Sequence, residues 1–294
     1  MPPRMSAHPA IAVSGLTRRY GAFVAVDGVS FEVRQGEAFG ILGPNGAGKT
    51  TTLEMIEGLR RPDAGEVHVL GRPVWPDPRS VQQLIGVQLQ STTLFDKLTA
   101  RELLELFARF YGRTDGRARA GDALALVGLE AKADAFAEDM SGGQQQRLAI
   151  ALALVHDPEV VFLDEPTTGL DPQARRNLWD VIRRIREAGK TVVLTTHYLE
   201  EAEQLCERVA IMDNAKVIAL DTPAGLIASL GADARVSYVA GGEEQVLYAA
   251  DAQQAVLTLL EEARTQGTAI ENLSVRGPSL EDVFLRLTGR EFRE

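Results

Sequence analysis

An apolar run that ends in a glycine-rich loop constrains the fold of this chain more than any other feature. Residues Ala38–Leu42 are typical of a short buried strand, and Gly43–Thr50 follows them with the spacing G-x-x-x-x-G-K-T. Glycines let the backbone wrap closely around an anion, and the N-terminus of a following helix adds a positive dipole. The sequence therefore predicts a strand–loop–helix unit of an α/β fold that binds phosphate groups.

The side chains of this loop can contact different parts of a nucleotide. The Lys49 ammonium can reach the β- and γ-phosphates, the Thr50 hydroxyl can ligate Mg²⁺, and Tyr20 is predicted to stack on the adenine ring. The alternatives are a glycine-rich turn with an unrelated lysine, which the preceding apolar strand disfavours, and a turn or core tyrosine. The residues expected to bind the nucleotide here are Gly43, Pro44, Asn45, Gly46, Ala47, Gly48, Lys49, Thr50 and Thr51.

A second apolar run ends in two acidic residues. Val160–Leu163 is followed directly by Asp164 and Glu165. A carboxylate at the end of a buried strand is costly unless a cation compensates its charge, so Asp164 is predicted to hold Mg²⁺ opposite Thr50. Glu165 is predicted to polarise or deprotonate the attacking water. Two acids that merely end a strand are the alternative when the pair is considered without the glycine loop.

His197 and Gln90 are predicted to complete a hydrolytic site. His197 follows the apolar run Thr191–Thr196. The carboxyl ends of parallel strands meet at one edge of a sheet, so this imidazole is expected near Asp164, within reach of the γ-phosphate or the water. The amide of Gln90 can ligate Mg²⁺ and orient water. Gln88 is two residues away, and the spacing from the glycine loop favours Gln90. A structural histidine is the alternative for His197.

A second pair of glycines begins another helix. Ser141-Gly142-Gly143-Gln144 precedes the helical run Gln145–Val155, and N–H donors at such a helix start form an anion site. The loop around Lys49 is already expected to bind the phosphates of one nucleotide on this chain. The second site is therefore expected to reach a nucleotide held by a neighbouring copy. An ordinary glycine-containing helix start is the alternative if the tetrapeptide is considered alone.

Together these motifs resemble the ATP-binding subunit of an ABC transporter. The motifs stand in family order over roughly residues 9–230: the loop 43–50, Gln90, Met140–Gln144, Asp164-Glu165, Gly169-Leu170-Asp171 and His197. The resemblance implies an α/β P-loop NTPase cassette, with a mixed-sheet core and a helical subdomain, that hydrolyses ATP with Mg²⁺. Met140 stands where leucine is commoner, and the Gln90 loop lacks the proline that often precedes the glutamine.

The same resemblance implies two protein partners. Two copies would stack head to tail, with Ser141 and Gly143 of one copy contacting the γ-phosphate bound by Lys49 of the other, and with Asp171 helping across the interface. ATP would hold this homodimer together and hydrolysis would reopen it. The cycle would drive a separately encoded membrane permease, docked on the helical subdomain near Gln90.

The C-terminal segment Pro278–Leu285 resembles the C-terminal signature of single-cassette exporters of the daunorubicin-resistance type. This resemblance implies export, with a drug or lipid-like cargo. It also implies a cytoplasmic location, peripheral on the inner face of the cell membrane. Specificity for the cargo would lie in the permease.

Hydrophobic patterning predicts three parts, with a helical subdomain inside the second: a tail at 1–10, the cassette at 11–230 (subdomain about 91–155) and a small α+β unit at 231–294. Thr99–Glu102 has the form of a helix capping box. A helix at about 173–188 between two apolar strands predicts that these strands are parallel.

In the third part, strands at 235–240 and 245–249 flank Gly241-Gly242, which indicates a hairpin. A helix at 251–266 is predicted to end at Gly267, and a strand at 270–276 follows. Ser279 is predicted to cap a last amphipathic helix.

Charge and composition narrow the functional classes. The net charge of −10 argues against nucleic acid as the main partner, because phosphate backbones select basic surfaces. The longest apolar run, Leu148–Val155, is far shorter than the roughly 20 residues of a spanning helix, and Met1–Met5 lacks the apolar core of a secretory signal. The single cysteine, Cys206, cannot form an internal disulfide.

Two other functions stay open on the sequence. A non-transport ABC ATPase, such as a translation or DNA-repair factor, typically carries two cassettes or long inserted arms. The one cassette and the acidic balance argue against this class. The other is an ATP-dependent regulatory module, in which the C-terminal part senses a ligand.

Overall fold

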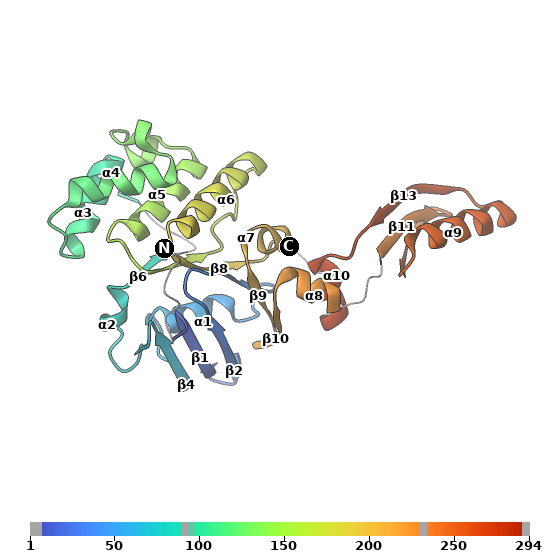
Figure 1. Cartoon of the computed structure of the whole chain (residues 1–294), viewed down its shortest axis with the longest axis horizontal. Helices are drawn as coiled ribbons and strands as arrows, with labels where there is room; N and C mark the ends of the chain where they lie inside the picture. Colours follow the sequence, from blue (N-terminus) through green and yellow to red (C-terminus); the bar gives the residue numbers. More distant parts are fainter. Residues whose placement is uncertain (1–7, 90–93, 96, 230–233, 290–294) are drawn as a thin grey trace. The chain divides into compact units, whose positions relative to one another are not determined.

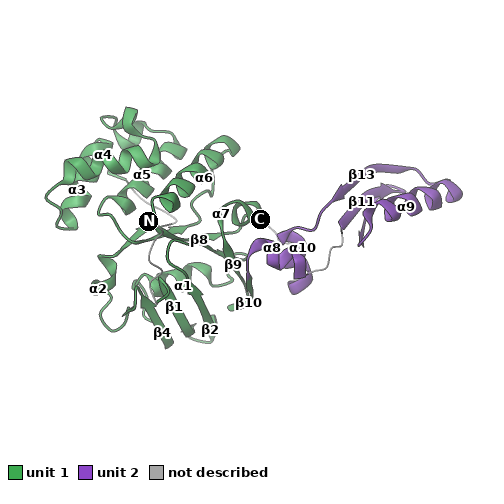
Figure 2. Ribbon diagram, in the orientation of Figure 1, with its two compact units in different colours: residues 1–220, 294 green, residues 221–293 purple. Residues whose placement is uncertain are grey.

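The computed structural model describes residues 8–89, 94–95, 97–229 and 234–289, and these form two compact units. Figure 2 colours the described residues of the first unit, up to Leu220, green and those of the second, from Asp221 on, purple. The division falls ten residues before the boundary expected from the sequence. Helix α8 (Pro223–Ser229) is the reason, because it packs against α10 (Leu280–Thr288) of the second unit.

A six-stranded sheet forms the centre of the first unit. Its order is β10-β9-β3-β8-β7-β6, and β3 lies parallel to β8 and β9 while β7 lies parallel to β6 and β8. Every residue of β3, β7 and β8 is buried, as the apolar residues at the centre of each strand predict. The strands are β3 (Ala38–Leu42), β6 (Ile85–Gln88), β7 (Val160–Asp164), β8 (Thr191–Thr196), β9 (Arg208–Asp213) and β10 (Lys216–Asp221).

A second, antiparallel sheet packs over the first. Its order is β2-β1-β4-β5, and Phe31 of β2 stacks on Phe39 of β3 with ring centroids 5.2 Å apart. Apolar side chains of both sheets and of α1 (Lys49–Ile56) share one core. The strands are β1 (Ile11–Tyr20), β2 (Phe23–Val33), β4 (Ala64–Val69) and β5 (Arg72–Pro73). The mixed sheets and helices confirm the predicted α/β class.

Helices α3, α4 and α5 pack together as a helical group (Figure 1). The predicted capping box begins α3: the Thr99 hydroxyl accepts from the Glu102 amide at 3.3 Å, and the Glu102 carboxylate accepts from the Thr99 amide at 2.9 Å. The first unit contains the helices α2 (Arg79–Gln82), α3 (Ala100–Phe110), α4 (Gly116–Val127), α5 (Gly142–Leu154), α6 (Pro172–Glu187) and α7 (Leu199–Leu205), and the 3₁₀ turns Glu130–Lys132 and Ala137–Asp139. In the described part of the chain, no helix has the length and apolarity that crossing a membrane requires.

The second unit has the elements predicted for it. The three strands β11 (Ala234–Ala240), β12 (Glu243–Ala249) and β13 (Ile270–Arg276) form a sheet in the order β12-β11-β13. Helix α9 (Ala252–Gln266) packs against this sheet (Figure 1), and Leu259 and Ala263 of the helix and Val236 of β11 are buried. Ser279 caps α10 as expected, since its hydroxyl accepts from the Asp282 amide.

Candidate nucleotide-hydrolysis site

The loop between β3 and α1 is shaped by glycines that no other residue could replace without strain. Gly46 and Gly48 have φ angles of 81° and 100°, in the left-handed region that side chains avoid. A Cβ on Gly48 would lie 2.3 Å from the Ala25 carbonyl oxygen, and one on Gly43 would lie 2.3 Å from that of Met212. The loop therefore packs directly on neighbouring backbone, and it leads into the N-terminus of α1, whose free amides can bind an anion.

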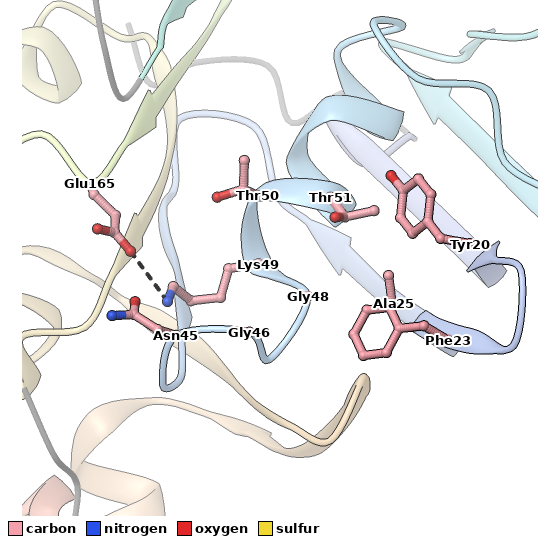
Figure 3. Close-up of a pocket in the computed structure, with 10 residues that line it drawn as sticks. All are labelled: Tyr20, Phe23, Ala25, Asn45, Gly46, Gly48, Lys49, Thr50, Thr51 and Glu165. Atoms are coloured by element: carbon pink, nitrogen blue, oxygen red, sulfur yellow. Dashed lines mark ion pairs between the residues drawn. The ribbon is translucent and has the colours of Figure 1, made fainter.

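The Lys49 side chain spans this loop. It is 5% exposed, and its Nζ donates to the carbonyl oxygens of Gly43 at 2.8 Å and Pro44 at 3.3 Å. Its ammonium also forms an ion pair with Glu165 Oε1 at 3.3 Å (Figure 3). A buried ammonium with three donors is well placed to exchange these partners for phosphate oxygens.

Asp164, the last residue of β7, lies beside the start of α1. Its Oδ1 is 3.4 Å from the Thr50 hydroxyl and accepts a hydrogen bond from the Thr195 hydroxyl of β8. Burial raises the pKa of Asp164 above its usual range, and the two hydroxyls only partly oppose that effect. A hydroxyl and a destabilised carboxylate side by side are hard oxygen ligands, so this pair fits a divalent cation such as Mg²⁺.

Glu165 turns away from Asp164 and meets His197. It has a φ of 46°, an uncommon left-handed conformation for a residue other than glycine. Its backbone amide donates to the Thr195 hydroxyl at 2.9 Å, and its Oε2 lies 3.2 Å from His197 Nδ1 and accepts from the Thr168 hydroxyl at 3.3 Å. The structure thus brings Lys49, Asp164, Glu165 and His197 together at the carboxyl edge of the sheet.

An aromatic pocket continues from the glycine loop. Tyr20 and Phe23 are directly opposite residues of the β1–β2 hairpin, so both side chains lie on one face (Figure 3). Tyr20 is covered by the guanidinium groups of Arg18 and Arg60, 5.1 and 5.4 Å from its ring centroid. The cavity has a volume of about 300 Å³ and is lined by Tyr20, Phe23, Ala25, Asn45, Gly46, Gly48, Lys49, Thr50, Thr51 and Glu165.

Sequence reasoning missed Phe23 and Thr195. Phe23 is 61% exposed at the mouth of the cavity, an unusual place for such a side chain. The signal was local, because a two-residue turn after Tyr20 places the next aromatic residue opposite it. Thr195 lies near the carboxyl end of β8, two residues before His197, and this position could have identified it as a possible partner of Asp164.

The glycine pair at 142–143 begins α5, away from this cavity. Ser141 precedes the helix, and its amide donates to the Gln144 side chain at 3.0 Å. Ser141 and Gly142 are exposed, whereas a Cβ on Gly143 would lie 2.9 Å from the Ala174 Cβ of α6. Among the described residues that line the cavity around Lys49, none comes from 141–144.

Asp171 and Gln90 do not join the cluster around Lys49. Asp171 is exposed and caps α6, because its Oδ1 accepts from the amides of Gln173 at 2.9 Å and Ala174 at 2.8 Å. Gln90 lies outside the described residues. Gln88, the residue that could be confused with it, is buried at the end of β6 with 2% exposure.

Comparisons with known proteins agree with this geometry. Residues 26–168 match the family model described as ABC transporter. A Nod factor export ATP-binding protein I of Burkholderia pseudomallei (strain 1710b) is 49% identical over 219 residues, which are 74% of this chain and 72% of that protein.

Solved structures resemble the chain over about three quarters of its length. A dimeric post-hydrolysis state of the ATP-binding cassette MJ0796, bound to ADP and Pi, is 31% identical with a TM-score of 0.65, covering 72% of this chain and 98% of that one. The structure of cbiO1 from Clostridium perfringens, part of an ABC transporter complex, is 27% identical with a TM-score of 0.71. The match covers 76% of this chain and 92% of that one.

Proposed function

The chain belongs to the ABC transporter family as an ATP-hydrolysing subunit, and from that premise we propose that it drives an export system. One observation carries the site assignment: Lys49 and His197 both contact Glu165 at the glycine loop, and the Thr195 hydroxyl joins them to the pair Thr50 and Asp164. The relatives named for Nod factor export support the direction of transport.

Nucleotide binding would use the cavity from end to end. The glycine-loop amides and Lys49 bind the β- and γ-phosphates, and the aromatic pair Tyr20 and Phe23 holds the adenine base. Thr50 and Asp164 would hold Mg²⁺, with Gln90 as a further ligand. The metal supplies charge neutralisation on the phosphate oxygens.

Hydrolysis would depend on Glu165 as general base. Its carboxylate lies between Lys49 and His197, at 3.3 and 3.2 Å, so the γ-phosphate drawn to Lys49 arrives beside it. Glu165 orients and deprotonates the attacking water, and the His197 imidazole, whose ring lies beside the carboxylate, donates to the γ-phosphate or the water.

A second copy would complete the site. Ser141, Gly142, Gly143 and Gln144 lie outside the cavity of their own chain, yet Ser141 and Gly142 are exposed at a helix N-terminus. We therefore assign them, with Asp171, to the γ-phosphate bound by the other copy. The dimeric post-hydrolysis state of the similar cassette MJ0796 supports this arrangement.

Glu165→Gln tests the base and the dimer together. The amide keeps the shape and cannot take a proton, so we expect ATP binding without turnover and accumulation of a dimer, measured by light scattering. Glu159→Gln, at an exposed acid just before β7, is the control. Wild-type turnover in Glu165→Gln would contradict the base, whereas an ATP-bound monomer would contradict only the dimer.

The permease would dock on the helical group near Gln90, and the chain would be cytoplasmic at the inner face of the membrane. The described neighbours of Gln90 support this site, because Leu89 and Phe95 are 47% and 54% exposed. The relatives' transport names disfavour a translation or repair ATPase.

We propose that the cargo is a drug or a lipid-like molecule, as in exporters of the daunorubicin-resistance type. Its support is the segment Pro278–Leu285, which forms the start of α10 and the turn before it. Co-purification of the membrane protein with tagged Glu165→Gln from the source membranes tests the partner. Recovery of no multi-span protein with the ATP-bound variant would contradict the transporter role.

A further inference from the structure

Glu201 of α7 is a completely buried carboxyl group just behind the site. Its exposure is 0%. Its Oε2 accepts from the Thr167 hydroxyl at 3.2 Å, its Oε1 accepts from the Trp179 indole N–H at 3.2 Å, and the Thr196 side chain lies close enough to favour its charged form. A buried carboxyl group is costly, so the convergence of three polar side chains on it indicates that the fold maintains this contact.

Two of these side chains belong to the segments that carry the site residues. Thr167 lies between Glu165 and Thr168 in the loop after β7, and Thr196 immediately precedes His197 at the end of β8. Side chains alternate along a strand. Consequently Thr195 contacts Asp164, while Thr196 lies on the opposite side, near enough to Glu201 to favour its charged form.

These two segments need such a connection. Glu165 adopts a left-handed backbone conformation, which persists only where surrounding contacts hold it. The strands end at Asp164 and Thr196, and the last backbone hydrogen bond described between them runs from the Glu165 amide to the Thr195 carbonyl oxygen at 3.2 Å. Trp179, which donates to the other carboxylate oxygen, lies in the interior of α6 and not in the segments of Glu165 and His197.

We propose that Glu201 is a positioning residue that fixes the loops of Glu165 and His197 relative to each other and so maintains their 3.2 Å contact. The inference rests on the proposed roles of Glu165 and His197. Glu201 itself touches neither the cavity nor the reacting atoms. Its effect therefore falls on turnover, while the glycine loop, which it does not contact, keeps its affinity for ATP.

The test compares ATPase kinetics of the full-length variants Thr167→Val, Glu201→Gln, Glu201→Ala and Trp179→Phe. Residues that orient catalytic groups typically cost 10- to 100-fold in activity when they are lost, so we expect a fall in kcat of about tenfold for Thr167→Val, with the KM for ATP unchanged. Glutamine retains an accepting oxygen, so Glu201→Gln keeps more turnover than Glu201→Ala. Glu200→Gln, an exposed change on the same helix, is the control.

Trp179→Phe separates positioning from mere stability. It removes one hydrogen bond from the same carboxyl group, so its Tm falls about as much as that of Thr167→Val, but its kcat stays near wild type. The inference would be overturned if Thr167→Val and Trp179→Phe lost equal amounts of kcat at equal losses of Tm. It would also be overturned if Thr167→Val raised the KM for ATP instead of lowering kcat. Thr167→Val keeps the side-chain shape, so it decides the matter even if Glu201→Ala fails to fold. Failure of the proposed function is distinct: there Glu165→Gln itself would turn over at the wild-type rate.

Discussion

At the scale of single residues, Glu57 is a buried carboxyl group that the proposed mechanism leaves unused. It follows α1, is 2% exposed, and its Oε1 has no hydrogen-bond partner in the described part of the chain. Burial, with smaller contributions from the charges of Asp164 and Glu54, raises the pKa of Glu57 to about 8. The folded protein therefore favours the neutral carboxyl group.

The pH dependence of stability follows from this shift. Below the ordinary pKa of about 4.5, Glu57 is protonated in both states and its contribution to stability is fully present. As the pH rises, the unfolded chain ionises first, so stability is lost progressively up to about pH 8. We expect Glu57→Gln to gain, relative to wild type, on the order of 3 kcal/mol of unfolding free energy between pH 5 and pH 8.

Urea unfolding at pH 5, 6.5 and 8 measures that gain. Glu66→Gln changes an exposed acid of β4 and is the matched control, for which we expect parallel curves. A Glu57→Gln difference that stays constant with pH would show that this carboxyl group is charged in the folded protein.

Phe23 tests the aromatic part of the cavity. Stacking of a base on an aromatic side chain contributes about 1–3 kcal/mol, so we expect Phe23→Ala to weaken ATP binding roughly tenfold while binding of inorganic tripolyphosphate stays unchanged. Calorimetry with both ligands measures this. Phe110→Ala removes another exposed ring, 70% exposed and outside the cavity, and serves as the control. Equal loss for ATP and tripolyphosphate would indicate a distorted loop.

At the scale of secondary-structure elements, the starts of α5 and α6 approach each other at Gly143. Its Cβ would lie 2.9 Å from that of Ala174, whereas a Cβ on Gly142 would meet nothing within 4 Å. We expect Gly143→Ala to lower the unfolding free energy by about 1–3 kcal/mol through overpacking. Gly142→Ala, the control, is neutral or slightly stabilising because alanine favours helix. Thermal unfolding compares the two variants, and equal Tm values would contradict this contact.

The elements that sequence predicted are those whose signals are local. The loop 43–50, the capping box at Thr99 and the hairpin at Gly241-Gly242 each depend on residues a few positions apart. Glu201 and Glu57 could not be recognised, because their partners lie on other strands and helices. The sequence predicted that His197 lies near Asp164, since parallel strands end at one edge of a sheet, but it did not predict the contact of His197 with Glu165.

At the scale of the whole molecule, the boundary between the two units has consequences for truncation. The contacts around the cavity, from Tyr20 to Glu201, all belong to the first unit, and each unit has its own buried apolar residues. We expect a chain ending at Asp221 to keep the ATP-induced rise in Tm of the full chain, about 2.7 kcal/mol of stabilisation at 100 times the dissociation constant. Thermal shift with and without ATP measures it, and loss of the rise would mean that the second unit supports nucleotide binding.

A chain ending at residue 230, the boundary predicted from hydrophobic patterning, tests whether the first unit ends there or at residue 220. It retains α8 but removes α10, against which the buried Leu226 of α8 packs. A seven-residue helix without its packing partner is not stable in water, so its amides exchange freely. We therefore expect residues 223–229 to be protected from hydrogen exchange in the full chain and unprotected in the chain ending at 230, with α1 equally protected in both. Retained protection of α8 without α10 would assign that helix to the cassette, and the division at residue 220 would then be wrong.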